Sequence, residues 1–142
     1  MGDGTLRGWV EGEIARLGLA ARFHLTGLLP PAKMPAVFHA SDIVAHCSLR
    51  EGLARTIPQA MLAGKPVIAF DIGGAREVVD ASTGVLLAPR DVEGLRSAIE
   101  TLAASPTARE ALGDAGRERC RTMFDHNRMV GEIEKVYGKL IG

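Results

Sequence analysis

Two short apolar runs that do not alternate with polar residues constrain the fold of this chain more than any other feature. Residues 43–48 read "IVAHCS" and residues 66–70 read "PVIAF". Strands of this composition are typical of parallel sheets that are covered by helices on both faces. A glycine-bearing loop and then a helical pattern follow each run. The sequence therefore predicts βαβ units with right-handed crossovers.

The remaining segments continue this alternation of helices and strands. Further strands are expected at residues 22–26 and in "TGVLLAP". The first helix is expected over residues 5–18, where a periodic apolar stripe comprises Leu6, Trp9, Val10, Ile14 and Leu17. Later helices are expected at 32–40, in "TIPQAMLAG" with Thr56 as N-cap and Gly64 as the end, in "GGAREVVD", and after Asp91, Ser105 and Asp125. The predicted fold class is α/β, a Rossmann-like parallel sheet with helices on both faces.

The composition restricts the classes of partner and compartment. The 142 residues fit one domain, spanning residues 1–142, and 17 basic residues balance 17 acidic ones. A net charge of zero argues against nucleic acid or an anionic membrane as a partner held mainly by charge. Cys47 and Cys120 show no disulfide or metal spacing, so we expect a reducing cytoplasm. No run reaches the length of a transmembrane helix, and no signal peptide is visible.

Three glycine-bearing loops are expected at one edge of the sheet. Gly27 follows the strand 22–26, Glu51-Gly52 follows 43–48, and Gly73-Gly74 follows 66–70. Ligands of such sheets bind outside the carboxyl ends of the strands. Glycine-rich loops before helices suit phosphate, whereas a carboxylate such as Glu51 suits neutral hydroxyls. Together these features indicate a nucleotide-sugar.

Each of these residues also has a purely structural interpretation. Glu51 could be an exposed loop residue, and Gly73-Gly74 a simple turn. Thr56 and Gln59 match the capping-box pattern, and spacing alone favours that role for Gln59. The four histidines, His24, His39, His46 and His126, lack the spacing of a metal site. No P-loop, dinucleotide fingerprint or nucleophile elbow is present.

The motifs resemble, in order and over nearly the whole chain, the C-terminal domain of group 1 retaining glycosyltransferases of the GT-B fold. "FHLTGLLP" resembles a V-x-F-x-G strand, and "ASDIVAHCSLREGL" resembles A-D-x-x-x-x-P-S-x-x-E-G, with Cys47 where proline is common. "QAMLAGKPVIAFDIGGAREVV" resembles E-A-M-A-x-G-x-P-V-I-A-x-x-x-G-G-x-x-E-x-V, which is the most specific block.

The resemblance implies roles for individual residues in holding a nucleotide-sugar donor. Glu51 would contact the hydroxyls of the transferred sugar and is the candidate catalytic residue. The backbone of Gly52, Leu53 and Ala54 would lie near the sugar and phosphates. Gln59 would lie at the ribose, Gly73 and Gly74 near the phosphates, and Gly27 and Leu28 near the base. In this family the leaving diphosphate needs no bound metal, so we expect neither a metal nor a cofactor.

The chain departs from the family pattern in two respects. Gln59 occupies the position of a glutamate, so a charged acceptor for the ribose is lost. The family's basic residues for the diphosphate, the first strand of the sheet and the acceptor-binding N-terminal domain would all precede Met1. We therefore expect a fragment of a longer enzyme, inactive in isolation.

Two alternatives remain open at this stage. The chain could be a non-catalytic binding module that forms a homodimer through the open edge of its sheet. It could also belong to a sugar-nucleotide epimerase of the same fold, although no catalytic acids for that reaction are identified.

Overall fold

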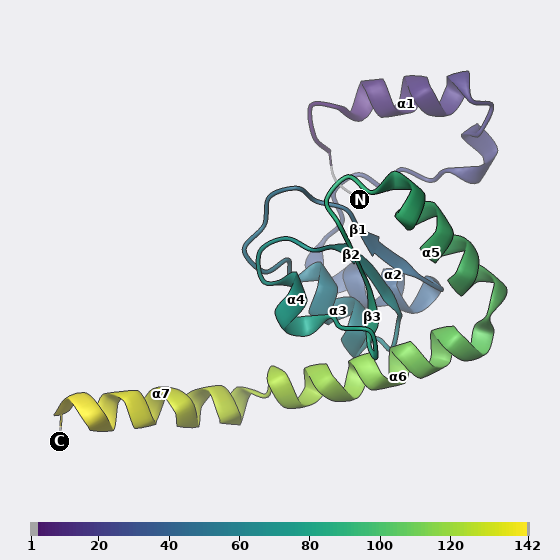
Figure 1. The fold of residues 1–142 in the computed structure, drawn as a ribbon. Coiled ribbons are helices and arrows are strands. Elements are labelled where there is room, and N and C mark those ends of the chain that lie inside the picture. Colours follow the sequence, from purple (N-terminus) through teal and green to yellow (C-terminus); the bar gives the residue numbers. More distant parts are fainter. Residues whose placement is uncertain (1–2, 142) are drawn as a thin grey trace. The chain divides into compact units, whose positions relative to one another are not determined.

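Three parallel strands form the sheet in the computed structural model, which describes residues 3–141. They are β1 (Val44–His46), β2 (Val67–Phe70) and β3 (Gly84–Leu87), in the order β1-β2-β3 (Figure 1). All pairs are parallel, and Ile68 of β2 is in register with Ala45 of β1 and Val85 of β3. The predicted parallel α/β sheet is therefore confirmed.

The described residues form two compact units that divide between Ala36 and Val37. The first unit contains α1 (Arg7–Arg16) and two short 3-10 turns, η1 (Ala20–Arg22) and η2 (Pro31–Lys33). Helix α2 (Met34–Ala40) leads into the second unit, which holds the sheet and all later helices. Our prediction of one ligand-binding domain over residues 1–142 stays a prediction.

The strand predicted at residues 22–26 does not form, and this prediction was wrong. Residue 22 ends η1, and residues 23–27 carry no strand pairing. A strand exists only through hydrogen bonds to a neighbour, and β1, β2 and β3 are the three strands among the described residues. The sequence of this segment is suited to a strand, but the described chain offers it no partner.

The apolar stripe predicted for the first helix also remains uncovered. Helix α1 forms as expected, but none of its residues is buried, and Trp9 is 66% exposed. Burial of such a stripe needs a packed neighbour, which helix periodicity alone does not supply.

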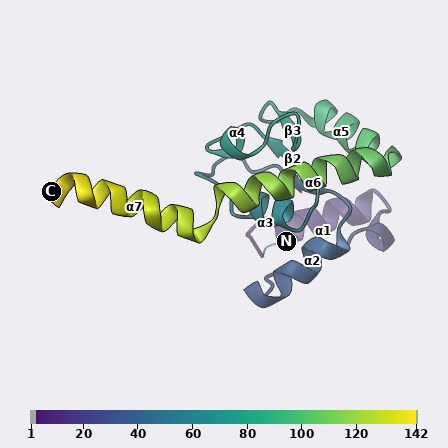
Figure 2. The same ribbon diagram turned by 90° about the horizontal axis from the view of Figure 1, so that it is seen from below.

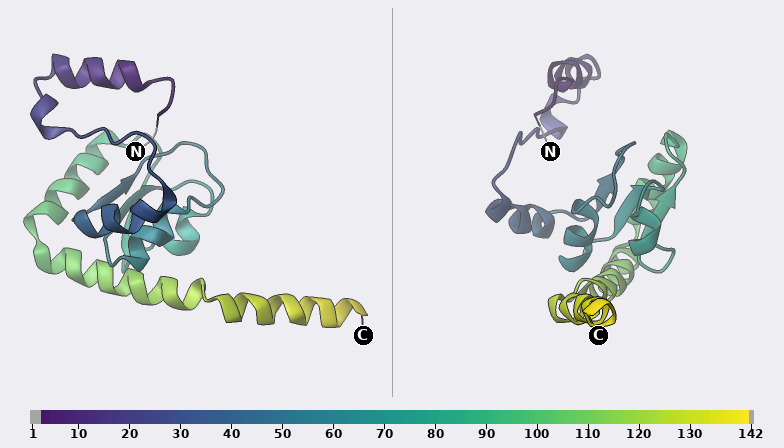
Figure 3. Two further views of the ribbon diagram at one scale, coloured as in Figure 1. Left: turned by 180° about the vertical axis from the view of Figure 1, so that it is seen from behind. Right: turned by 90° about the vertical axis from the view of Figure 1, so that its left-hand side faces the viewer.

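Helices cover the sheet of the second unit on both sides. Helix α3 (Thr56–Leu62) contacts β1 and β2, whereas α5 (Val92–Ala104) contacts β2 and β3 from the opposite side (Figure 3). Helix α6 (Pro106–Met123) packs along α3 (Figure 2). The four residues of α4 (Ala75–Val78) link β2 to β3, and α7 (His126–Ile141), which has no buried residue, ends the described chain.

The core lies between β2, α3 and α6. All four residues of β2 are buried, as expected for the central strand of a sheet covered on both faces. The largest fully buried side chains include Ile57, Met61, Val67, Ile68, Val78, Val79 and Cys120. Burial raises the pKa of the Cys120 thiol to about 11, so this cysteine acts as a small apolar residue of the core.

Three helix ends follow the predicted signals. The Asp91 carboxylate accepts a hydrogen bond from the Gly94 amide at 2.8 Å and caps α5. The Ser105 hydroxyl accepts from the Ala108 amide at 3.2 Å and caps α6. Helix α3 ends at Leu62, and Gly64 follows its C-cap residue Ala63 with φ of 71°, in the left-handed region that favours glycine.

The predicted start of α3 was wrong by one residue. Thr56 is the first helical residue, and the N-cap position is Arg55, with no side-chain cap hydrogen bond. Arg55 has φ −57° and ψ −22°, already in the helical region, so the Thr56 hydroxyl is not placed to cap. The capping box with Gln59 is therefore not formed.

Among residues 3–141, no helix combines the length and the apolar composition that crossing a membrane requires.

We predict that Gly113→Ala weakens the packing of α6 on α3. A Cβ atom at residue 113 would lie 2.2 Å from the Gly64 carbonyl oxygen, so the two segments would have to separate. Overpacking costs about 1–3 kcal/mol, of which about 1 kcal/mol is offset by the better helix propensity of alanine. Urea denaturation should show a net loss of up to about 2 kcal/mol in the free energy of unfolding.

Gly131→Ala is the matched control, because Gly131 of α7 has no atom within 4 Å of a built Cβ. It should leave this free energy unchanged or raise it by up to about 1 kcal/mol. Equal losses in both variants would contradict the packing explanation.

Candidate functional site

Two loops meet directly at the carboxyl ends of β1 and β2. Glu51 and Gly52 lie in the loop after β1, and Gly73 and Gly74 lie in the loop after β2. The Gly74 amide donates a hydrogen bond to the Gly52 carbonyl oxygen at 2.6 Å. The structure therefore brings together the two loops that the sequence singled out in this unit. We call them the Glu51 loop (residues 47–55) and the Gly73 loop (residues 71–74).

Packing between these loops explains the first glycine of the pair. Gly73 has φ of 49°, in the left-handed region that favours glycine. A Cβ atom there would lie 2.2 Å from the carbonyl oxygens of both Glu51 and Gly52. Any side chain at this position would push the Glu51 loop away. Gly73 therefore forms a turn, and this turn also packs against the Glu51 loop.

Glu51 presents its carboxylate to solvent at this contact. The residue is exposed, and its Oε1 accepts a hydrogen bond of 3.4 Å from the Ser48 hydroxyl. A carboxylate has about four lone-pair positions, so most of its accepting capacity is open to a ligand. The chemistry of the group suits hydroxyls that approach from solvent.

The rest of the Glu51 loop is anchored in the core. Leu53 is 37% exposed, and its Cβ lies 3.3 Å from the Cβ position of residue 74. Ala54 is buried, and its carbonyl oxygen accepts a hydrogen bond from the Ile57 amide at 3.0 Å. The loop is thus held from both sides, by the Gly73 loop and by the start of α3.

Gln59 lies on α3 with its side chain exposed. Its backbone amide bonds to the Arg55 carbonyl oxygen at 3.2 Å, as part of the first turn. Because the capping box is not formed, the structural role that we favoured for this side chain is wrong. The amide group of Gln59 can therefore act as an acceptor for a ligand hydroxyl.

Gly27 and Leu28 belong to the first unit. Gly27 has φ of 64°, and Leu28 is 80% exposed. A pocket of about 320 Å³ lies beside Gly27. It is lined by Gly4, Leu6, Arg7, Val10, Leu25, Thr26 and Gly27. The Arg7 guanidinium at this pocket is paired with Asp3 and Glu11.

Sequence reasoning missed an ion pair within the Gly73 loop region. Arg76 donates from Nε and Nη2 to the two carboxylate oxygens of Asp71, at 2.9 and 2.7 Å. The hydrogen bond to Asp71, followed by its charge, raises the pKa of Arg76 above its usual range. The signal was the position of Asp71 directly after a buried strand, at the edge where ligands bind. The pair places an arginine, whose charge is balanced by Asp71, next to the Gly73 turn.

The described part of the chain holds no group of three or more His, Cys, Asp or Glu side chains that could bind a metal ion. Our expectation that no metal takes part stays a prediction.

Comparisons with known proteins agree with the motifs. The family model "Glycosyl transferases group 1" matches residues 1–119. The 2-deoxystreptamine glucosyltransferase of Streptomyces kanamyceticus is 35% identical over 100% of this chain. The 2-deoxystreptamine N-acetyl-D-glucosaminyltransferase of Streptomyces fradiae is 37% identical over 84% of it. The chain spans only 37% and 26% of these two proteins.

Solved structures share the fold. Sucrose-phosphate synthase of Thermosynechococcus elongatus has a TM-score of 0.87 and 28% identity, covering 99% of this chain and 36% of its own. Anabaena HepE in complex with UDP-glucose has a TM-score of 0.84 and 29% identity, covering 93% of this chain and 36% of its own. The fold, the motifs and the family model agree, and the chain belongs to the group 1 glycosyltransferase family.

Proposed function

We propose that this chain is the donor-binding domain of a glycosyltransferase. The enzyme would move a sugar from a nucleoside-diphosphate sugar to an acceptor with retention of configuration. The observation that carries the proposal is the direct contact between the Glu51 loop and the Gly73 loop at the carboxyl edge of the sheet. The complexes of the similar Anabaena HepE with UDP and with UDP-glucose support the choice of ligand.

The geometry suggests how the two loops divide the donor between them. The carboxylate of Glu51 would accept hydrogen bonds from the sugar hydroxyls, and the exposed amide of Gln59 would accept from the ribose. The Gly74 amide already donates to the Gly52 carbonyl, so it is not available to a phosphate oxygen. We therefore assign the phosphates to the backbone of Gly52, Leu53, Ala54 and Gly73, and keep Gly74 as the link between the loops.

The roles of Gly27 and Leu28 near the nucleobase, which the family resemblance implies, stay predictions. The leaving diphosphate would be stabilised by protein groups alone, without a metal or a cofactor. A full-length enzyme would supply the acceptor site, and the isolated chain would bind donor without transferring sugar, because acceptor positioning is absent. The free thiols of Cys47 and Cys120 support a reducing cytoplasm as the location.

Two alternatives from the sequence stay predictions. In the described sheet, β1 pairs only with β2, so its outer edge could join that of a second copy. Light scattering would detect the dimer. An epimerase would convert the donor without any acceptor.

We predict that Glu51→Ala weakens the interaction with the sugar of the donor and leaves the interaction with its nucleotide unchanged. Calorimetric titration with UDP-glucose and with UDP separates the two. If Glu51 holds the sugar, its loss should weaken UDP-glucose about tenfold, equivalent to one charge-assisted hydrogen bond, and leave UDP unchanged. Glu100→Ala, an exposed glutamate on α5, is the matched control and should change neither affinity. Equal weakening of both ligands by Glu51→Ala would contradict the assignment.

We predict that Gln59→Glu tightens the binding of UDP. A charged acceptor makes a bond about twice as strong as a neutral one, which corresponds to roughly fivefold in affinity. Gln59→Ala should weaken UDP by about the same factor, since it removes the neutral acceptor. Identical UDP affinities in wild type and both variants would place the ribose elsewhere.

A further inference from the structure

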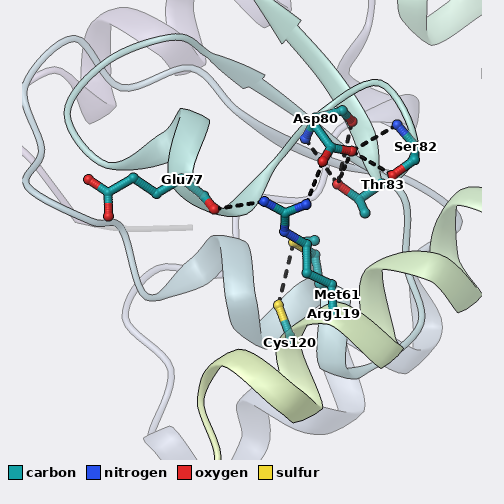
Figure 4. Close-up of polar contacts among 7 residues, drawn as sticks. All are labelled: Met61, Glu77, Asp80, Ser82, Thr83, Arg119 and Cys120. Carbon is teal, nitrogen blue, oxygen red and sulfur yellow. Dashed lines mark hydrogen bonds and ion pairs between the residues drawn. The ribbon is translucent and has the colours of Figure 1, made fainter. Parts of the chain in front are cut away.

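One arginine links α6 to α4 and to the segment that follows α4 (Figure 4). Arg119 donates from Nη2 to the Glu77 carbonyl oxygen at 3.0 Å, and from Nη1 to the Asp80 carboxylate. Its partners lie 42 and 39 residues away in the sequence. The Arg119 side chain is 34% exposed, so this pair is shielded better than the exposed ion pairs within single helices.

The acceptor of this contact is itself held in place. Asp80 Oδ1 accepts hydrogen bonds from the Ser82 amide at 2.9 Å and the Ser82 hydroxyl at 2.6 Å. The Asp80 amide donates to the hydroxyl of Thr83, a buried residue, at 3.0 Å. The Ser82 hydroxyl first, and then its amide, lower the pKa of Asp80, with a further contribution from Arg119. The carboxylate therefore offers Arg119 a fixed, ionised partner at neutral pH.

Helix α4 depends on such contacts from outside. It has four residues, and a helix of this length is not stable alone. At its N-terminal end, the Gly74 amide is bonded to the Gly52 carbonyl. At its C-terminal end, the Glu77 carbonyl is bonded to Arg119. The helix thus connects the α6 arginine with the Glu51 loop.

The arginine is costly for a purely stabilising contact. Its Nε atom is buried and has no hydrogen-bond partner among residues 3–141. A buried donor without a partner is unfavourable, which offsets part of the stabilisation that the ion pair provides. The planar guanidinium of Arg119, however, bonds two acceptors at once and can therefore fix the direction of α4. A lysine, as a point charge on a flexible stem, cannot reproduce that.

We propose that Arg119 is a positioning residue for the candidate donor site. It fixes α4 through the Glu77 carbonyl and Asp80, and α4 in turn fixes the Gly73 loop against the Glu51 loop. The consequence for donor binding rests on the proposed function, whereas the mechanical coupling does not.

The coupling is tested by hydrogen exchange of backbone amides in the nitrogen-15-labelled chain. Arg119→Met should raise the exchange rate of Gly74 at least tenfold and move its amide resonance, while Ile68 in β2 keeps its rate. Arg119→Lys should fall between wild type and Arg119→Met, because it retains the charge without the fork. Arg96→Met is the matched control, since within residues 3–141 the ion-pair partners of Arg96 are Glu93 and Glu100 of its own helix.

Either of two exchange results would overturn the proposal. An unchanged Gly74 amide in Arg119→Met would mean that the arginine does not hold the loop. Equal acceleration at Gly74 and Ile68 would mean that it stabilises the whole unit and positions nothing.

Donor affinity provides the second measurement, with UDP-glucose as the probe. Arg119→Met should weaken binding about tenfold, Arg119→Lys less, and Arg96→Met not at all. Unchanged affinity in Arg119→Met, with Gly74 released, would overturn the positioning role. If the wild-type chain binds no UDP-glucose, the proposed donor fails, and the exchange data alone decide whether Arg119 positions the loop.

Discussion

A single backbone contact, the hydrogen bond from the Gly74 amide to the Gly52 carbonyl, is the constraint on which the candidate site depends. It requires the loops after β1 and β2 to approach more closely than any side chain at Gly73 would allow. The parallel sheet makes this approach possible, because it brings the carboxyl ends of neighbouring strands to one edge. The exposed carboxylate of Glu51 then lies beside the backbone to which we assign the phosphates of the proposed donor.

Much of the second unit could be predicted because its signals are local. The apolar run of β2, the caps at Asp91 and Ser105, and the terminal Gly64 each depend on a few adjacent residues, and all appear as expected. Features that depend on distant partners could not be predicted. The segment 22–26 has strand-forming residues, but a strand also needs a neighbour to pair with. The contacts of Arg119 with Glu77 and Asp80 join residues about 40 positions apart, and no sequence motif predicts such contacts.

The candidate site shows the same division. Glu51, Gly52 and the glycine pair were found from their position after buried strands. The interpretation of Gln59 as a capping residue failed because the backbone of Arg55 is already helical, which leaves the Thr56 hydroxyl without a capping position. That failure strengthens the case for a ligand at Gln59, whose side chain is exposed. If the ribose binds at Gln59 as we propose, a neutral amide in place of a charged acceptor would hold the ribose less tightly.

The most direct test of the donor site is to titrate the labelled chain with UDP-glucose and follow its backbone amide resonances. We predict that the largest shifts occur at Gly52, Leu53, Ala54 and Gly73, with no comparable change on α5. Saturable shifts confined to other parts of the second unit, or none at millimolar ligand, would contradict the claim that these two loops together bind the donor.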